Sequence, residues 1–277
     1  KMVIADRCAV FANEIFNNSA DYSGFVLVLG AIFFAFQIYG DFSGYSDIAI
    51  GTARLFGFNL MQNFAFPYFS RDIAEFWRRW HISLSTWFRD YVYIPLGGSK
   101  GKAIIVLRNT LIVFVVSGFW HGANLTFIFW GLLNAIYFVP LLLSKANRRH
   151  LGNISEGRLL PTVGDTLKIL LTFSLTVFGW IFFRAQSITH AFDYIAGIFN
   201  KNFFTWYEFD DLWRVLLTSA LVVFFIAIEW LGRNNLYAIE KSFIRSKKVY
   251  RLAFYYLIVF LIFFAGGMQQ TFIYFQF

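Results

Sequence analysis

The sequence carries little charge for its length. Asp, Glu, Lys and Arg make up 14% of its 277 residues, whereas hydrophobic residues make up 58%. A water-soluble domain of this size needs a larger polar share to cover its surface. The shortage of charge therefore excludes an ordinary soluble globular protein and indicates an integral membrane protein.

Cysteine and proline are scarce as well. Cys8 is the single cysteine, so an internal disulfide and a cysteine-rich zinc site are both excluded. The chain has 4 prolines and shows no internal repeat, low-complexity tract or proline-rich linker. We therefore expect one all-α membrane domain over residues 1–277, with no metal site.

Long apolar runs, in contrast, are abundant. A run that approaches about 20 residues is long enough for a helix to cross a hydrocarbon core roughly 30 Å thick. The predicted spans are residues 23–40, 104–119, 123–143, 166–183, 213–231 and 252–268. This pattern predicts a multi-span helical bundle.

The basic residues are concentrated in short loops between these runs. Two such loops, 144–158 and 233–251, are predicted to be cytoplasmic by the positive-inside rule. The loop 184–212 then faces outward, and the same alternation puts residues 97–102 inside and His121 towards the outer side. Because these loops explain the net charge of +8, we expect contact with membrane lipid and none with nucleic acid.

Residues 67–95 carry too much charge to span a bilayer and are predicted to form one amphipathic helix at the interface or beneath the bundle. At about 100° per residue, charged residues such as Glu75 and Arg89 fall off its apolar stripe. His81 falls at the edge of the stripe, within reach of both protein interior and water. The stripe consists of Ile73, Phe76, Trp77, Trp80, Leu84, Trp87, Phe88 and Tyr91.

His121 interrupts an apolar segment, "SGFWHGANLTFIFWG", residues 117–131. Ionisable residues at membrane depth usually face a protein interior or a wet cavity. A neutral imidazole, whose ordinary pKa is near 6.5, can take a proton from a hydroxyl group. The alternative is a structural histidine that hydrogen-bonds between helices. His150 and His190 lie in predicted loops and are expected to be solvated.

Polar residues and glycines also follow the first apolar run, in "GDFSGYSDIAIG", residues 40–51. The backbone there is either irregular and lines a cavity or forms a capped helix junction. We favour the junction, with Asp41 or Ser43 as the cap and Asp47 in the first turns. Neither interpretation defines a carboxylate site.

Two segments together resemble the membrane-bound O-acyltransferases: "RRWHISLSTWFRDYVYIPLGG", residues 78–98, and "SGFWHGANLTFIFWG". Within that family the chain looks most like the bacterial alginate O-acetyltransferase type, with the D-alanyl-transferring teichoic-acid branch as a close cousin. Residues 37–58, 179–187 and 272–277 look like the same subgroup, so the resemblance covers nearly the whole chain.

The resemblance implies a ring of tilted and re-entrant or interfacial helices around a tunnel. It puts His121 at the family's essential histidine position and His81 at its second polar position. It also implies that an acyl thioester, acetyl-CoA or an acyl carrier, enters from the cytoplasm as co-substrate, with no bound cofactor. Family members usually carry further helices before residue 1, so this chain is expected to be the C-terminal part of a longer protein.

We therefore expect O-acyl transfer, in the first place acetyl transfer, to hydroxyls of an exported, alginate-like polysaccharide in the bacterial cytoplasmic (inner) membrane. His121 is the predicted general base, and His81 is predicted to position or polarise the thioester. The residues predicted to shape the substrate tunnel are Trp77, Arg78, Ser85, Trp120 and Asn124. Expected partners are the exopolysaccharide acceptor and periplasmic acetylation proteins or an acyl donor protein.

Two alternatives remain open at this stage. One keeps the chemistry but moves D-alanine or another acyl group from a carrier protein to teichoic acid or a glycolipid. The other is a polysaccharide transporter or channel, in which polar residues should recur along several helices. Here they concentrate around the two histidine segments, which favours a localised site.

Overall fold

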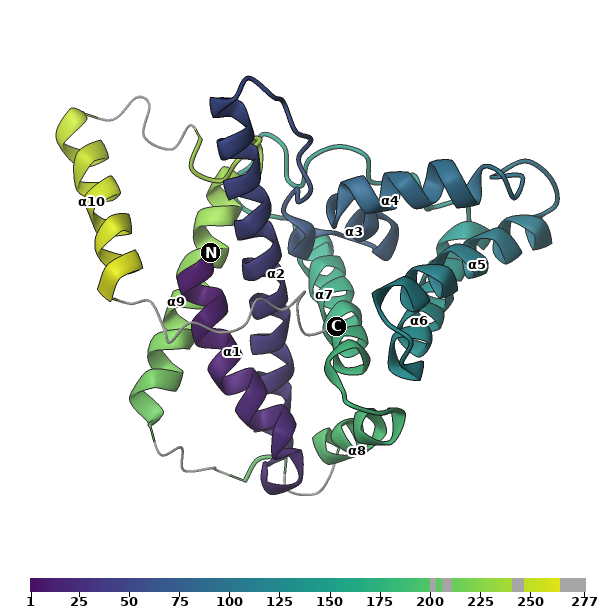
Figure 1. Ribbon diagram of the computed structural model, residues 1–277, viewed down its shortest axis with the longest axis horizontal. Helices are drawn as coiled ribbons and strands as arrows, with labels where there is room; N and C mark the ends of the chain where they lie inside the picture. The colour runs from purple at the N-terminus through teal and green to yellow at the C-terminus, as the bar shows by residue number, and fades with distance from the viewer. Residues whose placement is uncertain (200–202, 206–210, 241–246, 265–277) are drawn as a thin grey trace. The chain divides into compact units, whose positions relative to one another are not determined.

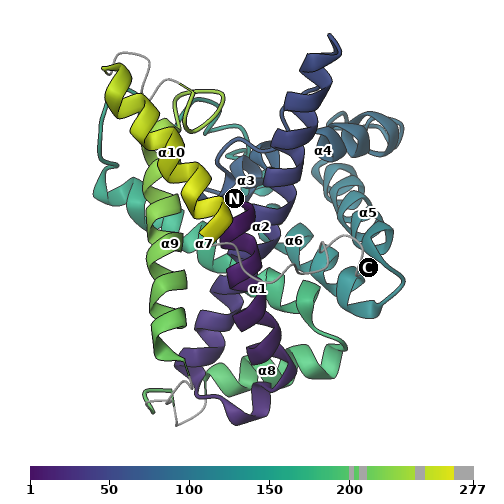
Figure 2. The ribbon, with the colours of Figure 1, turned by 60° about the vertical axis from the view of Figure 1, so that its left-hand side comes forward.

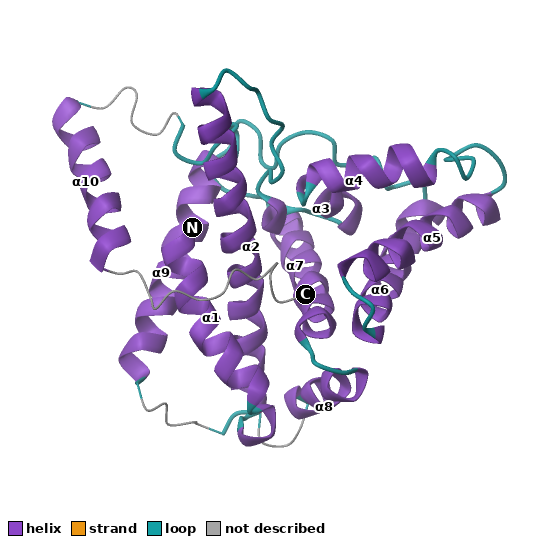
Figure 3. Cartoon of the chain, in the orientation of Figure 1, coloured by secondary structure: helices purple, strands orange, loops and turns teal. Residues whose placement is uncertain are grey.

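The computed structural model describes residues 1–199, 203–205, 211–240 and 247–264. All regular structure in these ranges is helical (Figure 3). They divide into two compact units, residues 1–58 with 193–277 and residues 59–192, and each unit is described by itself. The sequence-based expectation of a single domain stays a prediction.

Within the described ranges, five helices are long and apolar enough to cross a membrane. This confirms the prediction of an all-α, multi-span membrane protein. The helices are α2 (Gly24–Leu55), α5 (Ala103–His121), α6 (Leu125–Leu143), α7 (Val163–Arg184) and α9 (Leu212–Gly232). The predicted span 252–268 falls on α10 (Lys248–Phe264), which has 17 residues; its last residues, 265–268, lie outside the described ranges.

In the first unit, α1 (Met2–Asn17) lies along α2, and both contact α9 (Figures 1 and 2). The Tyr39 hydroxyl on α2 lies 2.8 Å from both carboxylate oxygens of Glu229 on α9. Glu229 is only 4% exposed, and a buried carboxylate needs such a donor. The α8 helix (Ile188–Ile198) ends in this unit, where the Tyr194 hydroxyl donates to the carbonyl of Leu27.

The polar segment 40–51 is neither irregular nor a helix junction, so both sequence-based interpretations are wrong. It lies inside the continuous α2 helix. The Ser43 hydroxyl donates to the Tyr39 carbonyl one turn earlier, which satisfies a polar group without breaking the helix. A Cβ at Gly40 would lie 3.1 Å from the Ala5 Cβ, so the glycine allows α1 to approach closely.

In the second unit, the segment predicted as one amphipathic helix is broken into short pieces. These are η2 (Pro67–Phe69), α3 (Ile73–Arg79), α4 (Ile82–Phe88) and the π-helical η3 (Arg89–Tyr93). The break falls at His81, whose φ of 45° and ψ of 57° are left-handed. The prediction of one regular helix is therefore wrong. Glu75 was also predicted to lie off the buried stripe, yet it is 1% exposed.

The next two helices, α5 and α6, form a tight antiparallel pair. A Cβ at Gly118 would collide with the carbonyl of Phe127, and a Cβ at Gly131 would collide with the carbonyl of Phe114. Small residues let apolar helices approach each other until their backbones are in contact. The glycines of "SGFWHGANLTFIFWG" thus fix the end of α5, where His121 lies.

Candidate active site

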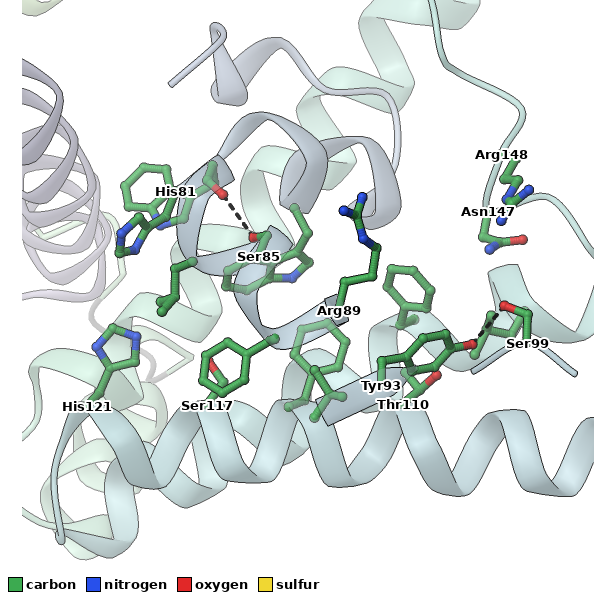
Figure 4. A pocket seen from close by; sticks show the side chains of 18 residues that line it. His81, Ser85, Arg89, Tyr93, Ser99, Thr110, Ser117, His121, Asn147 and Arg148 are labelled. Atoms are coloured by element: carbon green, nitrogen blue, oxygen red, sulfur yellow. Dashed lines mark hydrogen bonds between the residues drawn. The ribbon is translucent and has the colours of Figure 1, made fainter. Parts of the chain in front are cut away.

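A cavity of about 250 Å³ lies in the second unit (Figure 4). Side chains from α3, α4, η3, α5, α6 and the loop after α6 line it. His81 and His121 lie at one end, and Ser99, Asn147 and Arg148 lie at the other. The cavity therefore has a histidine end and an arginine end.

His81 is presented by the turn between α3 and α4. The Ile82 N–H donates to the Asn63 carbonyl and the Ser83 N–H to the Asn63 side-chain oxygen, both at 3.0 Å. Asn63 thus satisfies the first donors of α4 from a distant position in the chain. A left-handed backbone at a non-glycine residue costs about 1 kcal/mol or more and persists only when neighbouring contacts hold it.

The His81 imidazole is half-buried beside the ring of Phe64, with 6.5 Å between ring centroids. Burial lowers the pKa of His81 from 6.5 to about 4, because desolvation disfavours the imidazolium. The ring is therefore neutral at physiological pH. A neutral imidazole carries one N–H donor and one nitrogen acceptor, so it can donate a hydrogen bond to a carbonyl oxygen.

His121 is the last residue of α5 and is surrounded by aromatic rings. Its ring centroid lies 4.9 Å from that of Trp120, 5.3 Å from that of Trp130 and 5.1 Å from that of Phe183, all in edge-to-face geometry. Trp130 and Phe183 are themselves buried. These contacts hold the imidazole at the end of α5, where it lines the cavity.

The two histidines thus line the same end of one cavity. The α3–α4 break brings His81 next to the end of α5. The placement of His121 towards the outer side of the membrane stays a prediction.

Two of the predicted tunnel residues join the histidines in the lining. Trp77 forms part of the wall, with ring centroids 5.5 Å from Phe114 and 5.7 Å from Trp130. Ser85 also lines the cavity, and its hydroxyl lies 3.3 Å from the Trp80 carbonyl. Both therefore lie where a bound substrate would meet them.

The structure gives the other three predicted tunnel residues different contacts. Asn124 caps α6: its oxygen accepts from the Thr126 N–H, and its amide donates to the Gln186 carbonyl. Trp120 is 53% exposed, and its ring lies 4.9 Å from that of His121 between centroids. Arg78 donates to main-chain carbonyls of the loop after α6. Within the described residues, none of the three lines the cavity.

Several lining residues were missed, although their spacing carried a signal. On the α3–η3 segment the lining residues recur in steps of four: Trp77, His81, Ser85, Arg89 and Tyr93. On α5 they follow a similar three- or four-residue spacing: Thr110, Phe114, Ser117 and His121. Residues at such spacings share one helix face. Arg89 was predicted to fall off the apolar stripe because the segment was treated as one regular helix, whereas the helix is broken at His81.

The cavity has the chemistry for proton transfer and hydrogen bonding. Its lining combines imidazoles, hydroxyls and guanidinium groups, and no Asp or Glu is among the lining residues that the structure describes. The described ranges also hold no group of three or more His, Cys, Asp or Glu side chains that could bind a metal ion. The arrangement is suited to a neutral imidazole base acting on a hydroxyl group.

The chain matches a known protein family over more than half of its length. Residues 11–160 match MBOAT, the membrane-bound O-acyltransferase family. This range contains the whole cavity lining, including both histidines.

Individual relatives give the same result. The chain is 40% identical over 241 residues to the probable alginate O-acetylase AlgI of Pseudomonas aeruginosa, which covers 86% of this chain and 44% of that protein. It is 41% identical over 204 residues to the peptidoglycan O-acetyltransferase of Helicobacter pylori, covering 73% of this chain and 37% of that protein.

A more distant relative is the teichoic acid D-alanyltransferase of Bacillus subtilis, 29% identical over 167 residues, which cover 57% of this chain and 40% of that protein. The chain spans less than half the length of these relatives. Its helical architecture, its paired histidines and these matches agree. The chain belongs to the membrane-bound O-acyltransferase family.

Proposed function

We propose that the protein transfers an acyl group, most simply acetyl, from a thioester donor to a hydroxyl of an exported, alginate-like polysaccharide. The observation that carries the proposal is the pair of histidines at one end of a single cavity. The names of the relatives support it, since they are an alginate O-acetylase, a peptidoglycan O-acetyltransferase and a teichoic acid D-alanyltransferase.

In this mechanism His121 acts as general base. It takes the proton of the acceptor hydroxyl as that oxygen attacks the thioester carbonyl. The C–S bond then breaks, and the thiolate leaves with the proton that His121 gives back. General-base help of this kind contributes roughly 10²- to 10⁴-fold in rate. The edge-to-face contacts of Trp120, Trp130 and Phe183 hold the ring in place for it.

His81 acts on the donor in the same step. Negative charge develops on the carbonyl oxygen as the hydroxyl attacks, and a fixed hydrogen-bond donor stabilises it. His81 is neutral because its pKa is lowered to about 4, so an N–H of its ring can act as the donor without an added positive charge. The strained backbone at His81, capped by Asn63, holds this hydrogen-bond donor in one position.

The aromatic walls protect the thioester. Water that reached the reacting carbon would hydrolyse the donor, and closed active sites limit such side reactions. Around the histidine end, Trp80, Trp130 and Phe88 are all less than 5% exposed. Packing of this kind holds donor and acceptor together and adds to the rate by orientation.

The proposal extends to location and partners. A multi-pass chain with cytoplasmic basic loops fits the cytoplasmic (inner) membrane of a bacterium, with the thioester, acetyl-CoA or an acyl carrier, arriving from the cytoplasm. The acceptor is an exopolysaccharide on the outer side, served by periplasmic acetylation proteins. The second candidate, D-alanyl transfer from a carrier protein to teichoic acid, is favoured by the Bacillus subtilis relative.

A polysaccharide transporter is less well supported. Its polymer would need a polar path along several helices. In the described part of the second unit, the polar lining gathers in one cavity of about 250 Å³. That volume suits a small acyl group and a few neighbouring groups.

The experiment uses membranes that contain the protein at its natural full length. Labelled acetyl-CoA and a D-alanyl carrier protein are each tested with alginate oligosaccharides and with teichoic acid. We expect acetyl transfer to the oligosaccharide, and its loss in His121→Ala but not in the matched control His190→Gln. Full transfer by His121→Ala would remove the proposal, and D-alanyl transfer to teichoic acid would establish the second candidate.

A further inference from the structure

The arginine end of the cavity lies opposite the histidines and is open to solvent. Arg148 and Ser99 are exposed there, and Arg89 is exposed midway along the cavity, whereas His81 and His121 are half-buried. Arg148 lies in loop 144–158 and Ser99 in residues 97–102, the segments whose basic charge predicts a cytoplasmic location. This end is therefore suited to admit a substrate from the cytoplasm.

The two arginines that line the cavity differ in their partners. The Arg89 guanidinium pairs with the neighbouring Asp90 carboxylate at 2.7 Å. Among the described residues, no acidic side chain lies within ion-pair distance of Arg148. Arg148 is thus the guanidinium available for an anion that comes from outside the chain.

Arg78 holds the loop that carries Arg148. Its two terminal nitrogens donate to the carbonyls of Asn147 and His150, at 2.7 and 2.8 Å. These carbonyls lie one residue before and two residues after Arg148. A guanidinium can bridge two acceptors with its planar fork, which the single ammonium of lysine cannot copy. The bridge therefore sets the position of the Arg148 backbone.

The same loop is tied down a second time. Arg71 and Arg79 both donate to the Gly152 carbonyl, at 3.2 and 3.0 Å, and both pair with Glu75 at 2.9 Å. Burial by itself would raise the pKa of Glu75, but hydrogen bonds from Arg71 and the charges of Arg79 and Arg71 outweigh it and hold the pKa below its usual value. The ionised carboxylate orients both guanidinium groups towards the loop.

We propose that Arg148 recognises a phosphate group of the thioester donor, and that Arg78 is a positioning residue that places Arg148 at the cavity opening. This inference rests on the proposed function, because it assigns the donor to the arginine end and the acyl group to the histidine end. Guanidinium groups bind phosphate through paired, charge-assisted hydrogen bonds. Coenzyme A and the phosphopantetheine of a carrier protein share this phosphate chemistry.

The first test compares donors with and without phosphate in the full-length protein. In Arg148→Gln the KM for acetyl-CoA should rise about tenfold or more while kcat changes little. With S-acetyl-pantetheine, which lacks phosphate, Arg148→Gln and the wild type should behave alike. S-acetyl-phosphopantetheine and acetyl-CoA then show which phosphate is bound. Arg149→Gln, the same change one residue further along the loop, is the matched control and should keep the wild-type KM.

The second test addresses Arg78. Arg78→Lys should raise the KM for acetyl-CoA, with no effect on S-acetyl-pantetheine. In the double variant with Arg148→Gln, the KM for acetyl-CoA should be little higher than in Arg148→Gln alone, because both changes remove the same interaction. A merely structural role would instead lower kcat for both donors. Fully multiplicative KM effects would also overturn the positioning role.

Donor binding is measured separately from transfer. Equilibrium binding of coenzyme A is followed in His121→Ala and in the double variant with Arg148→Gln. Weaker binding of coenzyme A in the double variant supports the role of Arg148 even if no acceptor is acetylated. The failure of the proposed function and the failure of this inference can therefore be told apart. Equal binding of coenzyme A in both would overturn the assignment of Arg148.

Discussion

The two ends of the cavity are built from different interactions. At the histidine end, helix packing and backbone geometry fix the reacting groups: His121 lies among three aromatic rings, and His81 lies in a left-handed turn capped by Asn63. At the arginine end, side-chain hydrogen bonds from Arg78 hold a loop. We therefore expect changes at the histidine end to alter folding or turnover, and changes at the arginine end to alter the affinity for the thioester donor.

The largest effect is expected where α5 and α6 touch. In Gly118→Val the new side chain meets the Phe127 carbonyl, and backbone cannot move aside without separating the helices. We expect little or no folded protein, measured as loss of the monodisperse peak in detergent. Gly51→Ala is the control, because a Cβ there meets nothing within 4 Å. A monodisperse, active Gly118→Val would show that this contact does not shape the histidine end.

The buried carboxylate beneath the loop should have the next largest effect on stability. Glu75→Ala leaves Arg71 and Arg79 without their partner and should destabilise the protein by roughly 3 kcal/mol, as loss of one partner of a buried ion pair does. Thermal unfolding in detergent measures it. Asp165→Ala, which removes a half-buried carboxylate 3.7 Å from the exposed Lys168, is the control and should change stability by less than about 1 kcal/mol. Equal losses in the two variants would contradict the role of Glu75.

His81→Gln is expected to act on turnover. The glutamine amide can still donate a hydrogen bond but from a different position, so kcat should fall roughly 10²-fold with the KM for acetyl-CoA unchanged. His81→Gly should lower kcat as well but raise thermal stability, because glycine accepts the positive φ of 45° without strain. A fall in the affinity for acetyl-CoA with kcat unchanged would contradict the role of His81 in turnover.

Low pH should weaken the histidine end. The pKa of His81 is lowered to about 4 in the folded protein, whereas an unfolded histidine titrates near 6.5. The unfolded state therefore binds more protons between these values, and stability is lost progressively as pH falls from about 6.5 towards 4. Thermal unfolding temperature against pH should fall in this window and fall less in His81→Gln. Identical slopes for the two proteins would contradict the burial of His81.

The smallest effect is expected at Asn124. Asn124→Ala removes the cap of α6 and should cost about 1 kcal/mol of stability, with Asn124→Ser as the variant that keeps the cap. Neither change should alter the KM for acetyl-CoA by more than about twofold. A large KM change in both variants would restore Asn124 to the substrate tunnel, where the sequence alone had placed it.

Much of the architecture could be predicted because apolar runs of membrane length leave few alternatives to helices. The runs 104–119 and 166–183 match α5 and α7 to within a few residues. The paired histidines stood out for a similar reason, since His121 interrupts an apolar segment. A polar residue that interrupts a long apolar segment can be recognised from the sequence alone.

The failures arose where distant contacts decide local structure. The residues next to His81 do not predict a left-handed turn. The cap that holds this turn comes from Asn63, which lies 20 residues before Ser83 in the sequence. The helix through residues 40–51 is continuous, and the start of α1 lies against its Gly40 and Gly44, a contact that hydropathy does not show. The sequence also carries no sign that Arg78 would donate to the loop carbonyls of Asn147 and His150; its predicted place in the tunnel stays a prediction.

The most direct test of the central claim measures acetyl transfer at saturating acetyl-CoA by His121→Gln in the full-length protein. If His121 is the general base, kcat falls roughly 10²- to 10⁴-fold while coenzyme A binds as tightly as in the wild type. Arg148→Gln should show the opposite pattern, with kcat kept and KM raised. Wild-type turnover by His121→Gln would contradict the account.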